Sequence, residues 1–466
     1  MIERPRGAWR VWAEEAPLPA DGERLFAHLY GDRPVAVWFD SARRAYGMGA
    51  WSMMGAPELP RDRVLALRGG RVSLGDAPIG DDLWSELADR VDAHPIEPCG
   101  LPFTGGFVGS VGYGAKAIGR HRDDGGPDAQ LVHLSRFLLI DHERDVVHVV
   151  ATGPAPEEAE GRAWVAETRR RIARVPDLPE PAAPPRVGVA TASVTPERYR
   201  DDLRAVRRWL EAGDSYEACY TYRLGFAHAE APFEVYRRLR RRNPAPYAAY
   251  LRLPGREVLS CSPERYLTVT PAGWAETKPI KGTVRRVADP EADAAAARAL
   301  AADPKMRAEN LMIVDLLRND LGRISAPGTV EVPALMAVES YATVHQLVTS
   351  VRSKLLPRAA AGVRAAEALF PPGSMTGAPK RRTVELLDAL EAEPRGVYSG
   401  VIGWFSRCGA VDLSVVIRTA VIEDGRVTIG TGGAITIDSD PDAEAAETVT
   451  KSAALLEAFG RSHPFA

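Results

Sequence analysis

The chain has 466 residues, of which 45% are hydrophobic and 26% are charged, and its formal net charge at pH 7 is −3. This composition is that of an ordinary globular protein, long enough for about two to four cores, and it offers no general attraction to nucleic acid or to an acidic membrane. The four cysteines have no C-x-x-C spacing, which argues against a zinc ribbon or a disulfide scaffold.

The N-terminal residues lack the apolar segment of a secretory signal, and no apolar run reaches the ~18 residues of a membrane helix. We therefore expect a soluble, cytoplasmic protein with neither nucleic acid nor a membrane as a partner. The arginine-rich run at 237–242 is interpreted as a solvated helix face.

The first 175 residues predict short strands with two helices among them. An alternating pattern around the turn signal Gly69-Gly70 predicts a β-hairpin. The glycine-rich run at 101–114 lacks the lysine and the helix start of a phosphate-binding loop, so we interpret it as a strand with close backbone packing. The predicted strands lie at 34–40, 64–74, 136–141 and 146–151, and the helices at 81–92 and 156–174.

Five prolines fall between Pro176 and Pro185, the clearest break of composition in the chain. They predict a semi-rigid connector at 176–190, between an N-terminal region at 1–175 and a C-terminal region at 191–461. Thr195-Pro196 then predicts a helix start. Further helices are predicted at 196–212, 232–243, 290–302 and 304–321, and strands at 214–224, 247–253, 256–260 and 265–270.

Lys281 lies at a predicted strand end, directly before Gly282. Taken alone, such a lysine is typically an exposed cation beside a loop. The alternative is a nucleophile or an anion-holding group, because residues 274–286 hold two lysines and two arginines, whose positive potential would attract an anionic substrate and could lower the pKa of one amine.

Three glutamates are candidates for chemistry. Glu309 lies at the edge of an apolar helix stripe, where a carboxylate needs a cation, a hydrogen-bond network or solvent. Glu444 and Glu447 lie on one side of a helix whose predicted N-cap is Asp440. Such acids often only compensate the helix dipole, but they also suit a hard cation such as magnesium.

Three further features are ambiguous on their own. The glycine run that begins at Gly430 resembles many loops, although its small residues would let backbone N–H groups approach an anion. Arg418 lies inside an apolar run and needs an internal acid or a substrate carboxylate. His345 alternates with apolar residues, as a core histidine does. No Ser-His-Asp or Cys-His signature supports a hydrolase.

Taken together and in order, these segments resemble the chorismate-utilising enzymes, a family of anthranilate, aminodeoxychorismate, isochorismate and salicylate synthases. The resemblance is dense over 190–461 and looser at 40–41, 52–55 and 105–109. Its densest motifs are Ser262-Pro-Glu-Arg-Tyr, Pro279-Ile-Lys-Gly-Thr, Ala308-Glu-Asn-Leu-Met-Ile-Val-Asp-Leu-Leu-Arg-Asn-Asp, Val344-His-Gln-Leu-Val, Phe370-Pro-Pro-Gly-Ser-Met-Thr-Gly-Ala-Pro-Lys, Tyr398-Ser-Gly, Ile417-Arg-Thr, Gly432-Gly-Ala and Glu444-x-x-Glu-Thr.

The resemblance implies an α+β fold: a large antiparallel β-sandwich flanked by helices, with the N- and C-terminal parts interwoven in one unit. The proline-rich connector would then be an internal crossing rather than a hinge. The resemblance also implies a Mg²⁺ ion, held by Glu309 and Glu447 with support from Glu444, which neutralises the ring carboxylate of chorismate and polarises its C4 hydroxyl.

Other roles are carried over in the same way. Glu264 would be the general acid for the departing hydroxyl, with His345 beside it. Lys451, one helical turn after Glu447, joins the predicted substrate-binding residues. The enolpyruvyl carboxylate would be held by Arg418, Tyr398 and the backbone of Gly432, Gly433 and Ala434, and the ring by Gly282, Thr283 and Thr376.

Lys281 selects a branch of the family. Anthranilate synthases have alanine there, and ammonia attacks C2 directly. A lysine is similar to aminodeoxychorismate synthase component I, in which the amine attacks C2, expels the C4 hydroxyl and is displaced when ammonia attacks C4. The hydrolytic members have a water-activating lysine where this chain has Glu217.

The implied activity is magnesium-dependent amination of chorismate at C4, giving 4-amino-4-deoxychorismate for p-aminobenzoate. One alternative is an anthranilate synthase component I with an atypical lysine. Another is a catalytically silent subunit that binds an aromatic amino acid near Ser52.

Nothing in the sequence resembles the nucleophilic-cysteine segment of a glutaminase, so we expect ammonia from a separate glutamine amidotransferase subunit. Two residues depart from the family pattern. Met306 stands where an acid is usual, and Ala434 replaces the third glycine of its motif.

Overall fold

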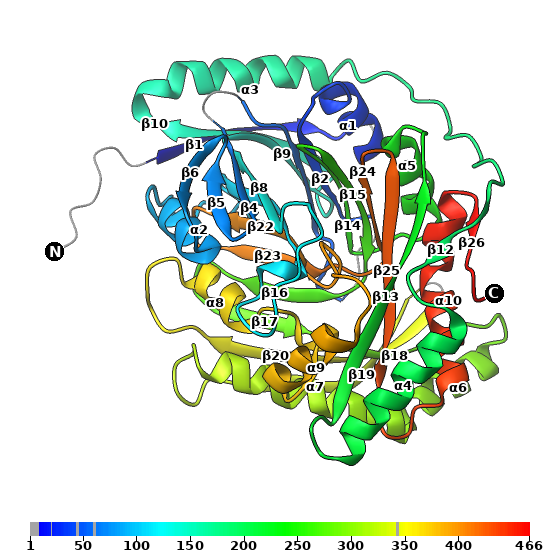
Figure 1. The fold of residues 1–466 in the computed structure, drawn as a ribbon. Coiled ribbons are helices and arrows are strands. Elements are labelled where there is room, and N and C mark those ends of the chain that lie inside the picture. The colour runs from blue at the N-terminus through cyan, green and yellow to red at the C-terminus, as the bar shows by residue number, and fades with distance from the viewer. Residues whose placement is uncertain (1–8, 20, 43–45, 59–61, 342–343) are drawn as a thin grey trace.

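The computed structural model describes residues 9–19, 21–42, 46–58, 62–341 and 344–466. Within these residues, two antiparallel sheets of twelve strands each form the centre of the molecule (Figure 1). Helices pack on the sides of the sheets that face away from the shared core. The expected α+β fold with large antiparallel sheets flanked by helices is therefore confirmed.

The first sheet contains strands from both ends of the chain. Its strand order in the described residues is β1 (Trp9–Pro17), β10 (Val146–Pro154), β9 (Arg136–Asp141), β3 (Trp51–Gly55), β2 (Ala36–Asp40), β14 (Tyr247–Leu253), β15 (Arg256–Ser262), β24 (Thr419–Glu423), β25 (Arg426–Ile435), β13 (Glu217–Ala227) and β12 (Thr191–Ala192), with β21 (Gly377–Ala378) beside β13.

The second sheet is equally mixed in chain order. Its strands are β18 (Ile280–Arg285), β20 (Val344–Lys354), β17 (Trp274–Lys278), β16 (Arg265–Val269), β23 (Val411–Val415), β22 (Val401–Ser406), β7 (Gly106–Val111), β8 (Ala129–Leu134), β4 (Val64–Arg68), β5 (Arg71–Leu74) and β6 (Ala77–Gly80), with β19 (Glu331–Ser340) beside β20. The hairpin predicted around Gly69-Gly70 is the β4–β5 pair.

Helices and short parallel strands complete the fold. The α-helices of the described residues are α1 (Gly22–Tyr30), α2 (Leu83–Asp92), α3 (Glu158–Ile172), α4 (Pro196–Glu211), α5 (Pro232–Arg242), α6 (Pro290–Ala302), α7 (Pro304–Gly322), α8 (Ala361–Leu369), α9 (Lys380–Leu390) and α10 (Pro441–Ala458). The predicted N-caps Thr195 and Asp440 both accept backbone hydrogen bonds. β11 (Gly188–Val189) pairs in parallel with β26 (Arg461–Ser462).

Strand β2 shows how the layers arise. Successive side chains point to opposite faces of a strand, so Val37 enters the core between the sheets and Trp38 enters the core under the helices. Both are fully buried. Because both faces are covered, the strand is a continuous apolar run rather than an alternating one.

Two strand pairings tie the N-terminal and C-terminal parts of the chain together. Trp38 of β2 is opposite Tyr250 of β14, and Gly109 of β7 is opposite Gly403 of β22. A Cβ atom on Gly109 would lie 2.1 Å from the carbonyl oxygen of Gln130, so the glycine-rich run is indeed a strand with close backbone packing. The expected interweaving is confirmed.

The arginine run on α5 is not the solvated face that the sequence indicates. Arg237 is 2% exposed, and its Nε donates to Glu23 Oε1 over 2.7 Å. Arg240 donates to Asp40 Oδ2 over 2.5 Å. The acids that neutralise these arginines lie about two hundred residues earlier, in α1 and β2, where helical periodicity cannot reveal them.

The proline-rich connector lies against these same helices. Arg237 donates to the carbonyl of Pro179, and Arg238 donates to that of Ala182 over 3.1 Å. The connector therefore has fixed partners along its length.

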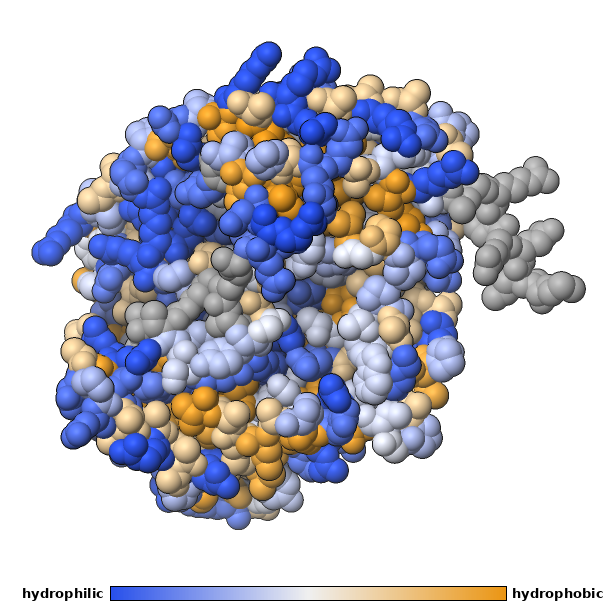
Figure 2. Space-filling model, turned by 180° about the vertical axis from the view of Figure 1, so that it is seen from behind, coloured by the Kyte–Doolittle hydropathy of each residue, from blue (hydrophilic) through white to orange (hydrophobic). Residues whose placement is uncertain are grey.

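No helix in the described part of the chain is long and apolar enough to cross a membrane. Figure 2 shows the face opposite to that of Figure 1, where hydrophilic residues surround several separate apolar areas.

The strand pairing across the connector leads to a prediction. If a protease site is inserted between Ala182 and Ala183 and cleaved, we expect the two fragments to co-elute in gel filtration and to unfold in one calorimetric transition, because β2–β14 and β7–β22 hold them together. Separate elution of the N-terminal fragment, or two unfolding transitions, would show that the two regions are independent.

Candidate active site

A cavity of about 530 Å³ lies between strands of both sheets and the helices α7 and α10. Strands β13 and β25 contribute from one sheet, and β18 and β20 from the other. Most residues predicted for the site line it: Glu264, Lys281, Gly282, Thr283, Glu309, Tyr398, Arg418, Gly432, Gly433, Ala434, Glu447 and Lys451.

His345, Thr376 and Glu444 do not line the cavity. His345 points to the opposite face of β20 from its lining neighbours Val344 and Gln346, as strand alternation requires. Its Nε2 is 3.1 Å from Asp293 Oδ1. His345, which was predicted to lie beside the general acid, therefore does not contact the cavity.

Thr376 and Glu444 lie next to residues that line the cavity but do not line it themselves. Thr376 is fully buried and donates to the carbonyl of Gly373 over 3.0 Å, while its neighbours Ser374 and Met375 line the cavity. Glu444 accepts from Ser439 Oγ over 2.7 Å.

Lys281 is a buried residue, not an exposed loop cation. Lys281 lies in β18, the edge strand of one sheet, and its Nζ donates to Glu217 Oε1 of β13 in the other sheet, so the pair joins the two sheets. Burial alone would lower the pKa of Lys281, but the negative charges of Glu217 and Glu309 outweigh burial and raise it above the usual range. The resting amine is therefore an ammonium.

The neighbouring cations do not lower the pKa of Lys281, although the sequence had indicated that they could. Lys278 is 2.8 Å from Glu339, and Arg286 is 2.6 Å from Asp293. Lys278 and Arg286 are thus neutralised by acids elsewhere in the chain, while Arg285 lines the cavity.

Carboxylates and lysines alternate at one end of the cavity. Lys305 Nζ is 2.8 Å from Glu444 Oε1 and 3.8 Å from Glu309 Oε1. Lys451 Nζ is 2.8 Å from Glu447 Oε1. Each of these three acids thus lies within 4 Å of a lysine ammonium.

Glu309 is the acid in this group that has the weakest partner. Within the described residues its carboxylate accepts no hydrogen bond, and burial raises its pKa to about 7 although Lys281 and Lys305 act in the opposite direction. No three His, Cys, Asp or Glu side chains of the described residues form a ready-made ligand cluster. Magnesium needs only one or two carboxylates with water and substrate, so Glu309 and Glu447 fit such an ion.

Glu264 lies at the wall of the cavity and is buried. Burial raises its pKa to about 7, although a hydrogen bond with Ser374 and the charges of Lys281 and Lys451 lower it. A carboxyl group with this pKa can donate a proton at neutral pH.

The glycine run is a strand rather than a loop. It forms part of β25, in which Gly432 is opposite Thr221 of β13. The pairing of β25 with β24 ends at Ile429, so the other edge of β25 is open toward the cavity beyond that point. Alternate backbone N–H groups along an unpaired edge can bind an anion.

Glycine is required at Gly430 for a steric reason. A Cβ atom there would lie 2.1 Å from Cγ of Tyr398, so the tyrosine ring occupies the space of a missing side chain. A Cβ atom on Gly432 would lie 2.3 Å from the carbonyl oxygen of Tyr220. These glycines let the cavity wall approach both an aromatic ring and the next strand.

Arg418 contributes a positive charge without a partner. Its guanidinium donates no hydrogen bond to any described residue, and burial lowers its pKa. Its backbone has a φ angle of +51°, which is rare for a residue with a side chain. A partly buried arginine in this state is suited to an incoming carboxylate.

Sequence reasoning missed several members of the site. Lys305 could have been found from its i, i+4 spacing to Glu309, and Gln346 from its alternation with Val344. The family resemblance marked Glu217 only as the position of a lysine in the hydrolytic members, and its contact with Lys281 depends on how the two sheets meet.

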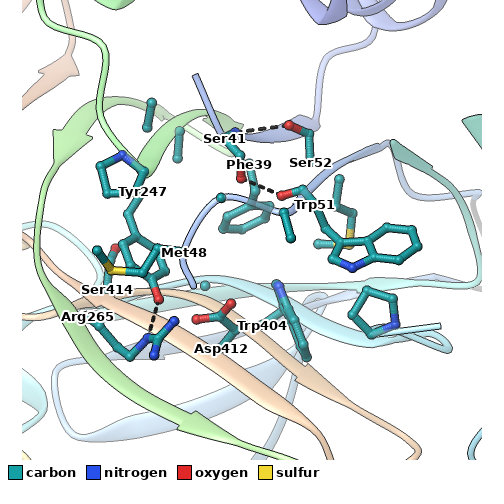
Figure 3. A pocket seen from close by; sticks show the side chains of 18 of the residues that line it. Phe39, Ser41, Met48, Trp51, Ser52, Tyr247, Arg265, Trp404, Asp412 and Ser414 are labelled. Atoms are coloured by element: carbon teal, nitrogen blue, oxygen red, sulfur yellow. Dashed lines mark hydrogen bonds between the residues drawn. The ribbon is translucent and has the colours of Figure 1, made fainter. Parts of the chain in front are cut away.

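A second cavity of about 150 Å³ lies between the sheets and shares no lining residue with the first in the described chain (Figure 3). It includes Ser52, near which the silent-subunit alternative would bind its ligand. Ser41 N donates to Ser52 Oγ over 3.0 Å, and Arg265 Nε donates to Tyr247 Oη over 2.8 Å. Burial raises the pKa of Asp412 on its floor to about 6.

Comparison with known proteins connects this geometry to a family. The chorismate binding enzyme family matches residues 64–457. Aminodeoxychorismate synthase of Streptomyces pristinaespiralis is 41% identical over 98% of this chain and 66% of its own length, so the chain spans just under two thirds of that relative.

Two further matches cover more of the partner's length. Aminodeoxychorismate synthase component 1 of Salmonella typhimurium is 37% identical over 80% of this chain and 81% of its own. The crystal structure of anthranilate synthase component I from Streptococcus pneumoniae has a TM-score of 0.77 and 27% identity, covering 88% of this chain and 92% of that one.

The unpaired state of Arg418 predicts an unusual effect on stability. We expect Arg418→Met to raise the free energy of unfolding of the ligand-free protein by about 1 kcal/mol, because it removes a desolvated charge that has no acceptor. Chemical denaturation of both proteins measures the change.

Arg395→Met is the matched control, since Arg395 is a buried arginine whose Nη1 donates to the carbonyl of Met375 over 2.6 Å and whose Nε donates to Glu391 over 2.9 Å. Its loss is expected to destabilise by about 3–5 kcal/mol. Equal destabilisation by the two substitutions would show that Arg418 has a compensating partner.

Proposed function

The chain belongs to the family of chorismate-binding enzymes, and from this premise we propose that it aminates chorismate at C4 as an aminodeoxychorismate synthase component I. The observation that carries the proposal is Lys281, whose amine lies in the wall of the cavity that also contains Glu264 and Arg418. A buried amine and a carboxylic acid with a pKa of about 7 supply a nucleophile and a proton donor in one site.

Chorismate has two carboxylates and a C4 hydroxyl. Arg418 and the open edge of β25 would hold the enolpyruvyl carboxylate, with the Tyr398 ring against it. Lys281 Nζ then bonds to C2, the ring double bonds shift, and the C4–O bond breaks as Glu264 donates a proton to the departing hydroxyl. Ammonia bonds to C4 and the bond between Lys281 and C2 breaks, which releases 4-amino-4-deoxychorismate for p-aminobenzoate.

Glu309 and Glu447, supported by Glu444, are the residues that would hold Mg²⁺. When bound, the ion neutralises the ring carboxylate and polarises the C4 hydroxyl. Without a cation, the acids at this end of the cavity would repel a dianionic substrate, and Lys305 and Lys451 offset only part of that repulsion.

We further propose that ammonia comes from a separate glutamine amidotransferase. Support comes from the name component 1, which the Salmonella typhimurium relative carries. The reaction would take place in the cytoplasm, where thiols such as the buried Cys219 stay reduced.

Anthranilate synthesis is the second candidate, because the Streptococcus pneumoniae anthranilate synthase component I shares the fold at 27% identity. The amine of Lys281 argues against it, since direct attack of ammonia on C2 requires no nucleophile at that position. A catalytically silent subunit would have no need of the acid, the amine and the carboxylates that share one cavity.

The product distinguishes these readings. With chorismate, Mg²⁺ and an ammonium salt, we expect the purified chain to form 4-amino-4-deoxychorismate, and Lys281→Ala to lose that product by about 100-fold or more because the nucleophile is gone. Liquid chromatography with mass spectrometry identifies the product. Glutamine alone should not replace ammonium. Anthranilate with pyruvate as the main product, or an unchanged rate in Lys281→Ala, would refute the proposed mechanism.

The protonation of Glu264 predicts a pH dependence. A general acid must carry its proton, and with a pKa of about 7 the protonated fraction falls about tenfold for each pH unit above that value. We therefore expect kcat to fall as the pH rises above about 7 when the concentration of free NH₃ is kept constant. A kcat that stays constant up to about pH 9 would exclude Glu264 as the acid, and Glu264→Gln provides the reference for its complete loss.

A further inference from the structure

Glu217 differs from other carboxylates that pair with buried lysines. Its Oε1 accepts from Lys281, but its Oε2 is buried and has no hydrogen-bond partner in the described structure. The residue is 1% exposed, so bulk solvent does not provide the missing donor. A buried acceptor without a donor is uncommon and calls for an explanation.

Two other lysine–carboxylate pairs show what a purely structural pair looks like here. Lys380 Nζ donates to Asp320 Oδ2 over 2.6 Å, and Arg323 donates to the other oxygen, Oδ1, over 2.9 Å. Lys380 also donates to the carbonyl of Leu369 over 2.7 Å. Lys380 and Asp320 thus each have a hydrogen-bond partner in addition to one another.

The second pair follows the same rule. Lys278 Nζ is 2.8 Å from Glu339 Oε1, and Tyr341 donates to Glu339 Oε2 over 2.9 Å. Lys278 also donates to the carbonyl of Tyr46 over 3.1 Å. Lys281, in contrast, donates to Glu217 and to no other acceptor in the described residues.

This difference has chemical consequences. Each hydrogen bond to a carboxylate stabilises its charged form, so a carboxylate with one donor is a better proton acceptor than one with two. A lysine with one acceptor also loses less when its amine leaves to form another bond. Separating Lys281 from Glu217 thus breaks fewer hydrogen bonds than separating either of the other two pairs.

The backbone holds Glu217 in place while its side chain remains free to accept. Glu217 begins β13 and is opposite Ala378 of β21, and Ser215 Oγ donates to its carbonyl over 2.9 Å. Strand β13 lies inside the sheet between β25 and β12. The carboxylate is therefore fixed from one sheet and the amine from the other.

We propose that Glu217 is the proton acceptor that converts the Lys281 ammonium into the attacking amine. The inference rests on the proposed function. Of the other groups that act on Lys281, Glu264 is needed as a proton donor and Glu309 as a ligand of the cation, and the Cys219 thiol has its pKa raised by burial. Glu217 alone of these is in hydrogen-bond contact with the reacting nitrogen.

The proton balance closes over one turnover. Glu217 takes one proton from Lys281, and Glu264 gives one to the C4 hydroxyl, which leaves as water. When ammonia has bonded to C4, its ammonium returns one proton to Glu264. Lys281 leaves C2 as a neutral amine and recovers its proton from Glu217. The sum is chorismate plus ammonia giving 4-amino-4-deoxychorismate plus water.

Glu217→Gln tests the inference, because the amide has the shape of the carboxylate and accepts a hydrogen bond but cannot take the proton of Lys281. Glu309 still favours the protonated amine of Lys281 in this variant. We expect kcat with saturating chorismate and ammonium to fall by about 100-fold or more and the KM for chorismate to stay within about twofold. Glu217→Asp, which keeps the acceptor at a shorter reach, should recover part of the lost kcat. This split between kcat and KM, with rescue by the shorter acid, is not expected of a structural role.

Asp320→Asn is the matched control, since it removes the carboxylate of a buried lysine pair outside the cavity and should lower stability while leaving kcat within about threefold. If Glu217→Gln keeps the wild-type kcat, burial alone makes Lys281 neutral and the inference is wrong. If Glu217→Asp is as inactive as Glu217→Gln, or if KM rises as much as kcat falls, Glu217 only positions Lys281. The proposed function fails separately, when the wild-type protein forms no 4-amino product.

Discussion

The interaction on which the site depends is the ion pair between Lys281 and Glu217, because it joins a strand of one sheet to a strand of the other at the wall of one cavity. Removing two charges from water is costly, and a buried pair is often no more stable than apolar side chains of the same size. Stability therefore does not explain its presence. The pair keeps an amine charged at a buried position, and it keeps the acceptor of that charge within one hydrogen bond.

The rest of the cavity is organised by the same need for charge balance. Glu309, Glu444 and Glu447 lie near Lys305 and Lys451, while Arg418 at the cavity wall donates no hydrogen bond to any described residue. The end rich in acids suits a cation, and the isolated arginine suits a carboxylate. A substrate with two carboxylates, one neutralised by a cation and one held by the arginine, satisfies both ends at once.

Local signals in the sequence predicted the elements well, since a hairpin turn at Gly69-Gly70 and N-caps such as Thr195 act within a few residues. The failures all involve partners that are distant in the chain. The arginines of α5 are buried because Glu23 and Asp40 neutralise them, and the glycines from Gly430 form a strand because Tyr398 and β13 pack against them. Family motifs identified most of the site and marked the position of Glu217, but they did not predict its contact with Lys281, which follows from the fold.

Lys281 and Glu217 also constrain each other in evolution. If an alanine replaced Lys281 alone, Glu217 would remain as a buried carboxylate without a cation, at a cost of about 3–5 kcal/mol. If a lysine replaced Glu217 alone, two ammonium groups would face each other in the same buried space. Under the proposed function, a change in which carbon of chorismate is aminated is therefore least costly when both positions change together. On that proposal, the choice of reaction depends on the contact between the two sheets as well as on the nucleophile.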